Sequence, residues 1–80
     1  MKIPRDISGI ELAHKLRPLG YEIVRQTGTH MRLTRIGDEE QHITIPSHGS
    51  LKIGTLNNIL GDIASQLRLN KRELVEQLFS

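Results

Sequence analysis

The apolar positions near the start of the chain recur at helical spacing and predict a helix over residues 8–19. Ser8 is a candidate N-cap, and Glu11 three residues later completes a capping-box pattern. Pro18 ends the pattern, and Gly20 can adopt the left-handed conformation that closes a helix. The apolar stripe of this helix consists of Ile10, Leu12, Ala13 and Leu16.

The middle of the chain has strand composition and, in large part, alternates polar and apolar residues. We expect strands over residues 21–26, 30–35 and 41–45. A turn at 27–29 and a polar loop at 37–40 join them into antiparallel hairpins, and Pro46 stops the last strand. Period two turns one set of side chains toward a core: Met31, Leu33, Ile43 and Ile45. The opposite, wet face then carries His30, Arg32, Thr34, His42 and Thr44.

Helical spacing returns after a loop at residues 47–54 that contains two glycines. Thr55 is a candidate cap for this second helix. Asn70 with Glu73 forms another capping-box-like start, which predicts a short final helix over residues 70–79. Whether these two helices are separate or one kinked helix stays open at this stage. The stripe of the second helix consists of Leu56, Ile59, Leu60, Ile63, Ala64 and Leu67.

The order helix, three strands, two helices predicts an α+β fold whose antiparallel sheet is covered by helices on one face. With 80 residues the chain has room for one domain, which we expect to span residues 1–80. Only Tyr21 and Phe79 are aromatic, so the core must consist largely of Leu, Ile and Val.

Composition and charge narrow the class of protein. The chain has no run of the roughly 18 apolar residues that a membrane span needs, and its first residues have no apolar signal region. Without cysteine there is no disulfide and no thiolate metal site, which fits a cytoplasmic protein. Residues 1–36 carry seven Lys or Arg against three acids, whereas residues 37–80 carry four against six. The basic half is suited to a polyanion such as nucleic acid.

The turn before the second predicted strand contains the first candidate chemistry. His30 follows Gly28-Thr29 where a turn meets a strand, and an imidazole can take or give a proton near pH 7. Backbone N–H groups around Gly28 are candidates to hold a phosphate oxygen, and Arg32 points to the same face as His30. These groups suit RNA cleavage. The alternative is an ordinary surface histidine at the start of a strand.

The loop after the third strand is a candidate anion site. His48 lies among small residues that lead into a helix N-terminus, where the first N–H groups are free, and Lys52 adds a positive charge. An ordinary solvated loop explains the same residues. His42 shares the outward face, and two interpretations are open: it lies near His30 across the hairpin, or it is an ordinary cross-strand surface residue, which we favour. A metal site from His30, His42 and His48 is disfavoured, because no carboxylate or helical His pair accompanies them.

Taken in order, three segments resemble a known family. They are Gly28-Thr29-His30, the stretch from His42 to His48, and the stretch from Leu51 to Leu56 that leads into a helix. Together these look like the HicA-type toxins of toxin–antitoxin pairs. The resemblance extends from about Ile7 to Phe79. No single motif is specific, but the ordered set is.

The resemblance implies a fold and an activity. The fold would be like that of the double-stranded RNA-binding domain, α-β-β-β-α, here with an extra short C-terminal helix. The activity would be that of an endoribonuclease that cleaves messenger RNA, with His30 at the position of the family's catalytic histidine and without a metal or other cofactor. The partner would be a HicB-type antitoxin that covers the active site. The sequence departs from many members at Met31, which the alternation turns into the core.

We therefore expect a toxin endoribonuclease in which His30 is catalytic. The residues expected to bind or orient phosphate are Gly28, Thr29, Arg32, His48 and Lys52. Two alternatives of other classes stay open. One is a non-catalytic RNA-binding module. Such domains carry a dense lysine cluster at the N-terminus of the last helix, and the chain has only Lys52 there, which argues against this alternative. The other is a protein-interaction module with incidental histidines.

Overall fold

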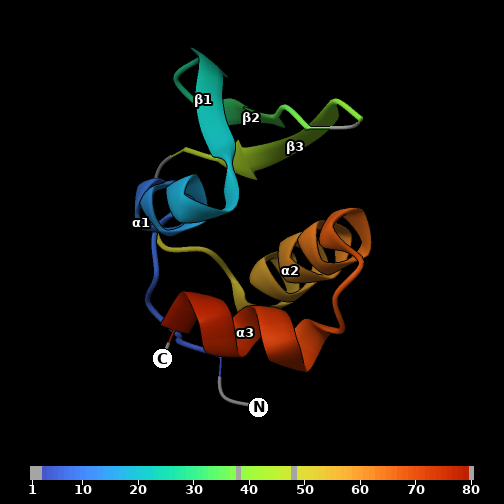
Figure 1. The fold of residues 1–80 in the computed structure, drawn as a ribbon. Coiled ribbons are helices and arrows are strands. Elements are labelled where there is room, and N and C mark those ends of the chain that lie inside the picture. Colours follow the sequence, from blue (N-terminus) through green and yellow to red (C-terminus); the bar gives the residue numbers. More distant parts are fainter. Residues whose placement is uncertain (1–2, 38, 48, 80) are drawn as a thin grey trace.

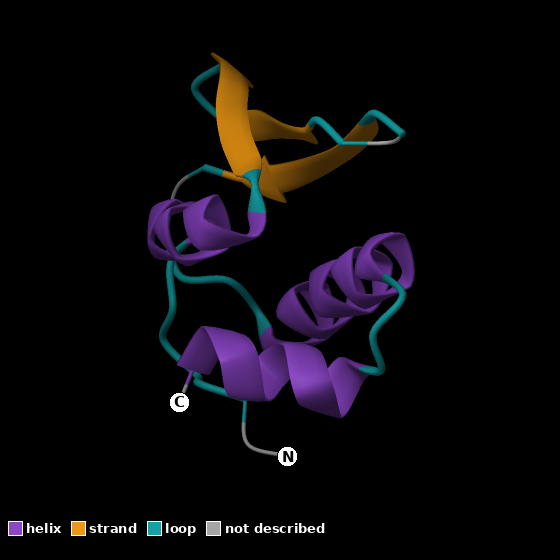
Figure 2. Ribbon diagram, viewed as in Figure 1, coloured by secondary structure: helices purple, strands orange, loops and turns teal. Residues whose placement is uncertain are grey.

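The computed structural model describes residues 3–37, 39–47 and 49–79. Figure 1 shows three layers: a twisted sheet, then α1 and α2 against one of its faces, then α3 across the far side of these two helices. Figure 2 shows the same division of helices and strands. The elements are α1 (Gly9–Leu16), a 3₁₀ turn η1 (Arg17–Leu19), β1 (Tyr21–Gln26), β2 (His30–Arg35), β3 (Gln41–Pro46), α2 (Ile53–Leu67) and α3 (Lys71–Phe79).

The sheet confirms the predicted α+β class and its element order. Its strands are antiparallel in the order β1-β2-β3, so β2 is central. The four side chains predicted to face the core are buried, with Met31, Leu33 and Ile45 fully so. β3 runs one residue beyond the prediction, since Pro46 pairs with His30. An edge strand tolerates proline because one side of its backbone has no strand partner.

The first helix is capped as predicted but is shorter than expected. The Ser8 hydroxyl accepts a hydrogen bond from the Glu11 N–H at 3.1 Å. α1 then ends at Leu16, and the last predicted turn is the separate 3₁₀ turn η1, because Pro18 has no N–H to continue the α-helical pattern. Gly20 closes the segment in the left-handed conformation with φ 99°, as the sequence indicated.

The start of α2 corrects a prediction. Lys52, not Thr55, is the N-cap, and the helix begins at Ile53. The reason lies in tertiary contacts: Leu51 is buried, and its N–H donates to the Ile7 carbonyl at 2.8 Å. This fixes the chain just before the helix, and the Lys52 carbonyl can then accept the first helical bond from the Leu56 N–H.

The last two helices are separate. Arg68 adopts a left-handed conformation with φ 57°, and its N–H bonds back to the carbonyls of Ala64 and Ser65, which terminates α2. The Asn70 side chain then accepts a hydrogen bond from the Glu73 N–H at 2.8 Å, the predicted cap of α3. Within the described residues no helix has the length and apolar character to cross a bilayer.

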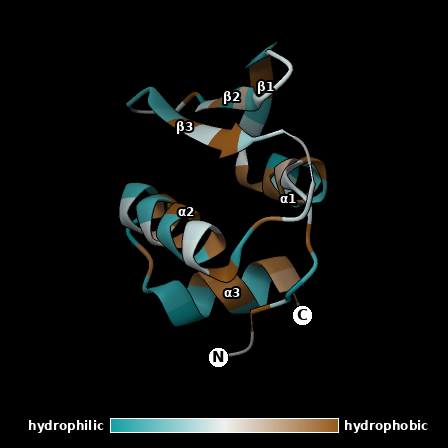
Figure 3. Ribbon diagram, turned by 180° about the vertical axis from the view of Figure 1, so that it is seen from behind, coloured by the Kyte–Doolittle hydropathy of each residue, from teal (hydrophilic) through white to brown (hydrophobic). Residues whose placement is uncertain are grey.

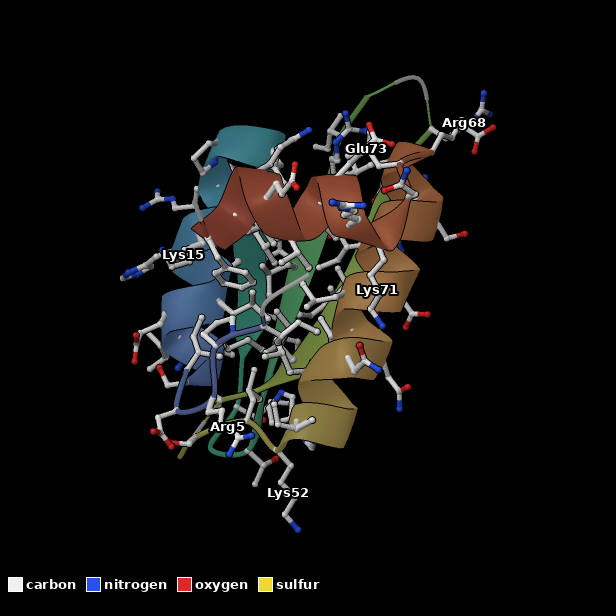
Figure 4. All side chains as sticks on the ribbon, turned by 90° about the horizontal axis from the view of Figure 1, so that it is seen from below. Arg5, Lys15, Lys52, Arg68, Lys71 and Glu73 are labelled. Carbon is white, nitrogen blue, oxygen red and sulfur yellow. The ribbon has the colours of Figure 1, made fainter. Side chains whose placement is uncertain are left out.

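The core lies between the sheet and the helices and continues between α3 and the other two helices. Apolar and polar residues form opposite stripes on α2 and α3 (Figure 3). In Figure 4, seen from below, α3 crosses in front of both α1 and α2. α3 contributes the buried side chains of Leu74, Val75 and Leu78.

One residue of the predicted wet face is buried. Thr34 is only 7% exposed. It lies on the central strand between Glu22 and His42, its directly opposite neighbours on the two outer strands. A short side chain between two longer ones loses contact with water, and its hydroxyl lies 2.8 Å from Nδ1 of His42. The alternation predicted its face correctly but not its burial.

Candidate active site

His30 is the first residue of β2 and is exposed. It lies on the outer face of the sheet, which we define as the face turned away from the helices. Its partner on β3 is Pro46, and its chain neighbour Met31 is fully buried. A rigid strand therefore anchors the residue from one side, while its ring is open to solvent.

The turn that presents His30 is organised by the hydroxyl of Thr27. This oxygen accepts hydrogen bonds from the N–H groups of Thr29 at 3.3 Å and His30 at 3.1 Å. The Thr27 N–H in turn donates to the His30 carbonyl at 2.8 Å. A threonine that binds the backbone of the following residues in this way is a known turn motif. The predicted turn over residues 27–29 is confirmed, and the hydrogen bonds of Thr27 within it are an addition to that prediction.

A contact from the far end of β3 also supports the turn. The Ser47 N–H donates to the Thr29 carbonyl at 2.9 Å. Ser47 is 7% exposed, although the loop it begins was expected to be solvated. The turn is thus held from its own side chains and from the neighbouring strand, which restricts where the His30 ring can move.

The imidazole of His30 has one nitrogen engaged within the turn. Nδ1 lies 2.9 Å from the hydroxyl oxygen of Thr29. This contact orients the ring, and it assigns to Thr29 a role in positioning His30. The second nitrogen, Nε2, is then the one suited to exchange a proton with a bound molecule.

Backbone N–H groups of the turn are less available than the sequence suggested. Those of Thr29 and His30 are already bonded to Thr27. Gly28 has open space where a Cβ would lie, so neither packing nor backbone conformation demands glycine there. That openness leaves the surface beside His30 accessible to a large ligand.

Arginine side chains flank His30 on the outer face. Arg32 is two residues along β2, is exposed, and lies directly opposite Thr44 on β3. Arg25, on β1, lies directly opposite Arg32 on the other side. The alternation of β2 predicts the position of Arg32, whereas that of Arg25 is not predictable in this way, because β1 departs from regular pairing at this point.

Lys52 lies at the N-terminus of α2, whose first turn has no acidic side chain and no side-chain cap. Its ammonium group extends away from the body of the protein (Figure 4). It is five positions along the chain from Ser47, which contacts the turn, and such a segment spans at most about 18 Å. Among the described residues no hydrogen bond or ion pair joins the Lys52 side chain to the His30 turn. His48, also expected in this region, lies outside the described residues.

His42 is not near His30, so the favoured interpretation, an ordinary cross-strand residue, holds. Both are on the outer face, but His42 is opposite Thr34, four residues along β2 from His30. That separation is about 13 Å along the strand. Both ring nitrogens of His42 have partners, since Nδ1 contacts the Thr34 hydroxyl and Nε2 lies 3.2 Å from a carboxylate oxygen of Glu40. The register of β2 with β3 decides this separation, since the two histidines share a face of the sheet.

Next to Arg32, a cavity of about 560 Å³ opens between β3 and α2. Its lining includes Arg32, His42, Thr44 and Asp62. Among the residues that the structure describes, no group of three or more His, Asp or Glu side chains is arranged to hold a metal ion. The surface around His30 is thus basic, hydroxyl-bearing and open.

Comparison with known proteins places this arrangement in a family. A family model for the HicA toxin of bacterial toxin–antitoxin systems matches residues 9–64. The match includes α1, the whole sheet and most of α2, and therefore the His30 turn. No curated protein and no solved structure gave a match. A match over more than half of the chain establishes membership, and the chain belongs to the HicA toxin family.

Proposed function

We propose that this chain is a toxin endoribonuclease that cleaves messenger RNA in the cytoplasm, with His30 as its catalytic residue. The observation that carries the proposal is the presentation of His30, exposed on a hydrogen-bonded turn beside Arg32, within the region that matches the HicA family. Proton transfer by a positioned histidine contributes typically 10²–10⁴-fold to a rate.

The proposed reaction uses the 2′-hydroxyl of the RNA as the nucleophile. The O2′–P bond forms while the P–O5′ bond breaks, the 2′-hydroxyl gives up its proton, and the departing 5′ oxygen gains one. Nε2 of His30 carries one of these two proton transfers. Arg32 offsets the negative charge that develops on phosphorus oxygens, because a guanidinium suits a phosphate in charge and geometry. No metal takes part in the proposed route.

Five further residues complete the proposed site, each with its own role: Gly28, Thr29, Arg32, His48 and Lys52. Thr29 orients the ring through its 2.9 Å contact to Nδ1. Gly28 leaves room for the RNA beside it. Lys52 binds a phosphate farther along the RNA, and His48 is proposed for the same task from its place in the sequence. As a member of a toxin–antitoxin family the chain has an antitoxin partner, and we propose a HicB-type protein that covers the His30 surface.

The test compares RNA cleavage by the wild-type chain and by His30→Ala, in EDTA, on one long messenger RNA. We expect the wild type to cut and leave 2′,3′-cyclic phosphate ends, and His30→Ala to be at least about 100-fold slower. The matched control is His14→Ala, because His14 is an exposed histidine on α1, away from the turn. His14→Ala should cut as the wild type does.

Equal cleavage by the wild type and His30→Ala would remove His30 from the mechanism. Steeply salt-dependent RNA binding without strand scission would identify a non-catalytic RNA-binding module instead. Absence of RNA binding, together with no toxicity when the chain is expressed alone, would identify a protein-interaction module.

A further inference from the structure

An irregularity in β1 decides which face Arg25 occupies. Ile23 pairs with Leu33 and Arg25 pairs with Arg32, so two residues of β1 advance while β2 advances by one. Val24 is the extra residue of this β-bulge. In a regular strand Arg25 would share the inner face with Tyr21 and Ile23. The bulge turns it to the outer face, beside Arg32.

The result is a pair of arginines directly opposite each other on neighbouring strands. Opposite residues in an antiparallel pair have Cα atoms about 4.5–5.5 Å apart. Like charges in such positions are destabilising, so the fold gains nothing from this pairing. The ion pairs found among the described residues are His42 with Glu40 and Arg72 with Glu76, and neither includes Arg25 or Arg32.

Nearby acids do not neutralise the pair. Glu22 lies on the outer face of β1, but it is opposite Thr34, in another row of the sheet. Asp62 lines the cavity next to Arg32, yet it forms no ion pair with it. Two exposed arginines thus lie directly opposite each other on neighbouring strands, and neither forms an ion pair within the part of the chain that the structure describes.

We infer that Arg25 and Arg32 together form a binding site for a backbone phosphate of single-stranded RNA, next to the scissile phosphate at His30. The inference rests on the proposed function, since it adds a positioning residue, Arg25, to the same surface. His30 and Arg32 are two residues apart on one face, a rise of about 6.7 Å. The RNA backbone would cross the outer face of the sheet, from the His30 turn over the arginine pair.

The chemistry of the pair favours a phosphate. Two guanidinium groups offer several N–H donors in planar sets, and these match phosphate oxygens bidentately. A bound phosphodiester carries one negative charge, and between the two arginines it offsets their repulsion. The arginine pair therefore lowers the stability of the free protein, and its charges are offset only in the complex. This favours a role in binding over a role in stabilising the fold.

The test measures binding of 2′-O-methylated single-stranded RNA, which lacks the nucleophilic hydroxyl and stays intact, as a function of salt. Arg25→Gln should weaken binding several-fold and reduce the slope of log K against log salt by about 0.7, the value of one lost phosphate contact. Arg25→Lys should keep the slope and lose part of the affinity. Arg72→Gln is the control of equal charge change, because Arg72 is on α3, remote from the sheet (Figure 1).

Thermal unfolding of the same variants tests the structural alternative. We expect the melting temperature of Arg25→Gln to equal or exceed that of the wild type, because the substitution removes a repulsion. A lowered melting temperature that accompanies the loss of affinity would overturn the inference. So would a salt slope that matches those of the wild type and Arg72→Gln, or an Arg25→Gln effect seen only on binding of an acidic protein.

The two proposals fail separately. If the wild type cuts RNA through His30 but Arg25→Gln binds as the wild type does, the arginine pair is rejected and the nuclease stands. If Arg25→Gln lowers the slope while no cleavage occurs, the nuclease is rejected and the phosphate site stands.

Discussion

At the scale of single residues, one hydroxyl has a large effect on the candidate site. Oγ1 of Thr27 bonds the backbone N–H groups of both Thr29 and His30. The position of the catalytic candidate is thereby set by a side chain that would not itself touch RNA. Its hydrogen bonds span at most three residues of sequence, so a threonine preceding Gly-Thr-His carried a readable signal of this turn.

Tyr21 is a second residue whose environment makes a prediction. Its side chain is fully buried, and its hydroxyl donates a 2.6 Å hydrogen bond to Oε1 of Gln66. Burial raises the pKa of the Tyr21 hydroxyl above its usual value, and the nearby Arg35 guanidinium opposes this rise. The folded state therefore holds this proton more tightly than the unfolded state does.

The sign of the pH effect follows from that difference. Above the unfolded pKa of about 10 the unfolded chain releases the Tyr21 proton first, so stability falls as pH rises through that value toward the folded pKa. Tyr21→Phe should cost about 1 kcal/mol near neutral pH through the lost hydrogen bond. It should then lose less stability than the wild type at alkaline pH.

Urea unfolding of the two proteins between about pH 8 and pH 11 measures this difference. Tyr21 is the only tyrosine of the chain, so tyrosinate absorbance reports its titration alone. A titration midpoint at or below that of free tyrosine would contradict the prediction.

At the scale of elements, one close contact fixes how α1 meets the sheet. Gly9 begins α1 and is buried. A Cβ at this position would collide with the carbonyl oxygen of Pro46 at the end of β3. The Pro46 carbonyl is part of the backbone of β3 and cannot move without disturbing the strand. The helix can therefore approach the strand this closely only because residue 9 has no side chain.

Gly9→Ala should therefore destabilise the protein by about 1–3 kcal/mol or more. Gly61→Ala is the matched control, because Gly61 is within α2 and a Cβ there meets no atom within 4 Å. This second change should stabilise the protein by about 0.5–1 kcal/mol, the usual gain of alanine over glycine in a helix. Denaturant unfolding measures both, and equal effects of the two would refute the proposed contact.

Most elements could be predicted from the sequence, since their signals are local. Ser8, Gly20 and Asn70 all cap helices where the pattern indicated, because each acts on residues at most three positions away. The predicted start of α2 at Thr55 was wrong. The contact that determines the start joins Leu51 to Ile7, and these residues are far apart in sequence. The bulge at Val24 was missed for a similar reason, since it exists only relative to β2.

At the scale of the whole molecule, α3 completes the core. It lies beyond the matched family region, which ends at residue 64. It packs against the sides of α1 and α2 that face away from the sheet, with Leu74 fully buried (Figures 1 and 4). A domain of 80 residues has a small core, so the three buried apolar side chains that α3 adds are a substantial contribution to it.

Leu74→Ala should cost about 2–5 kcal/mol, a large part of the stability of a domain of this size. The melting temperature should fall by roughly 10 °C or more. Gln77→Ala, an exposed substitution on the same helix, should change stability by less than about 0.5 kcal/mol. If the melting temperature of Leu74→Ala equals that of the wild type, α3 does not belong to the core.

The sequence by itself determined the α+β class, the element order, the inner face of the sheet and the exposure of His30, because each depends on residues within a few positions of one another. Only the tertiary structure decided which outer-face residues are neighbours. It separated His42 from His30, buried Thr34 between two longer side chains, and placed Arg25 opposite Arg32. Strand register and bulges are pairings between distant segments, and the periodicity of one strand carries no information about the strand beside it.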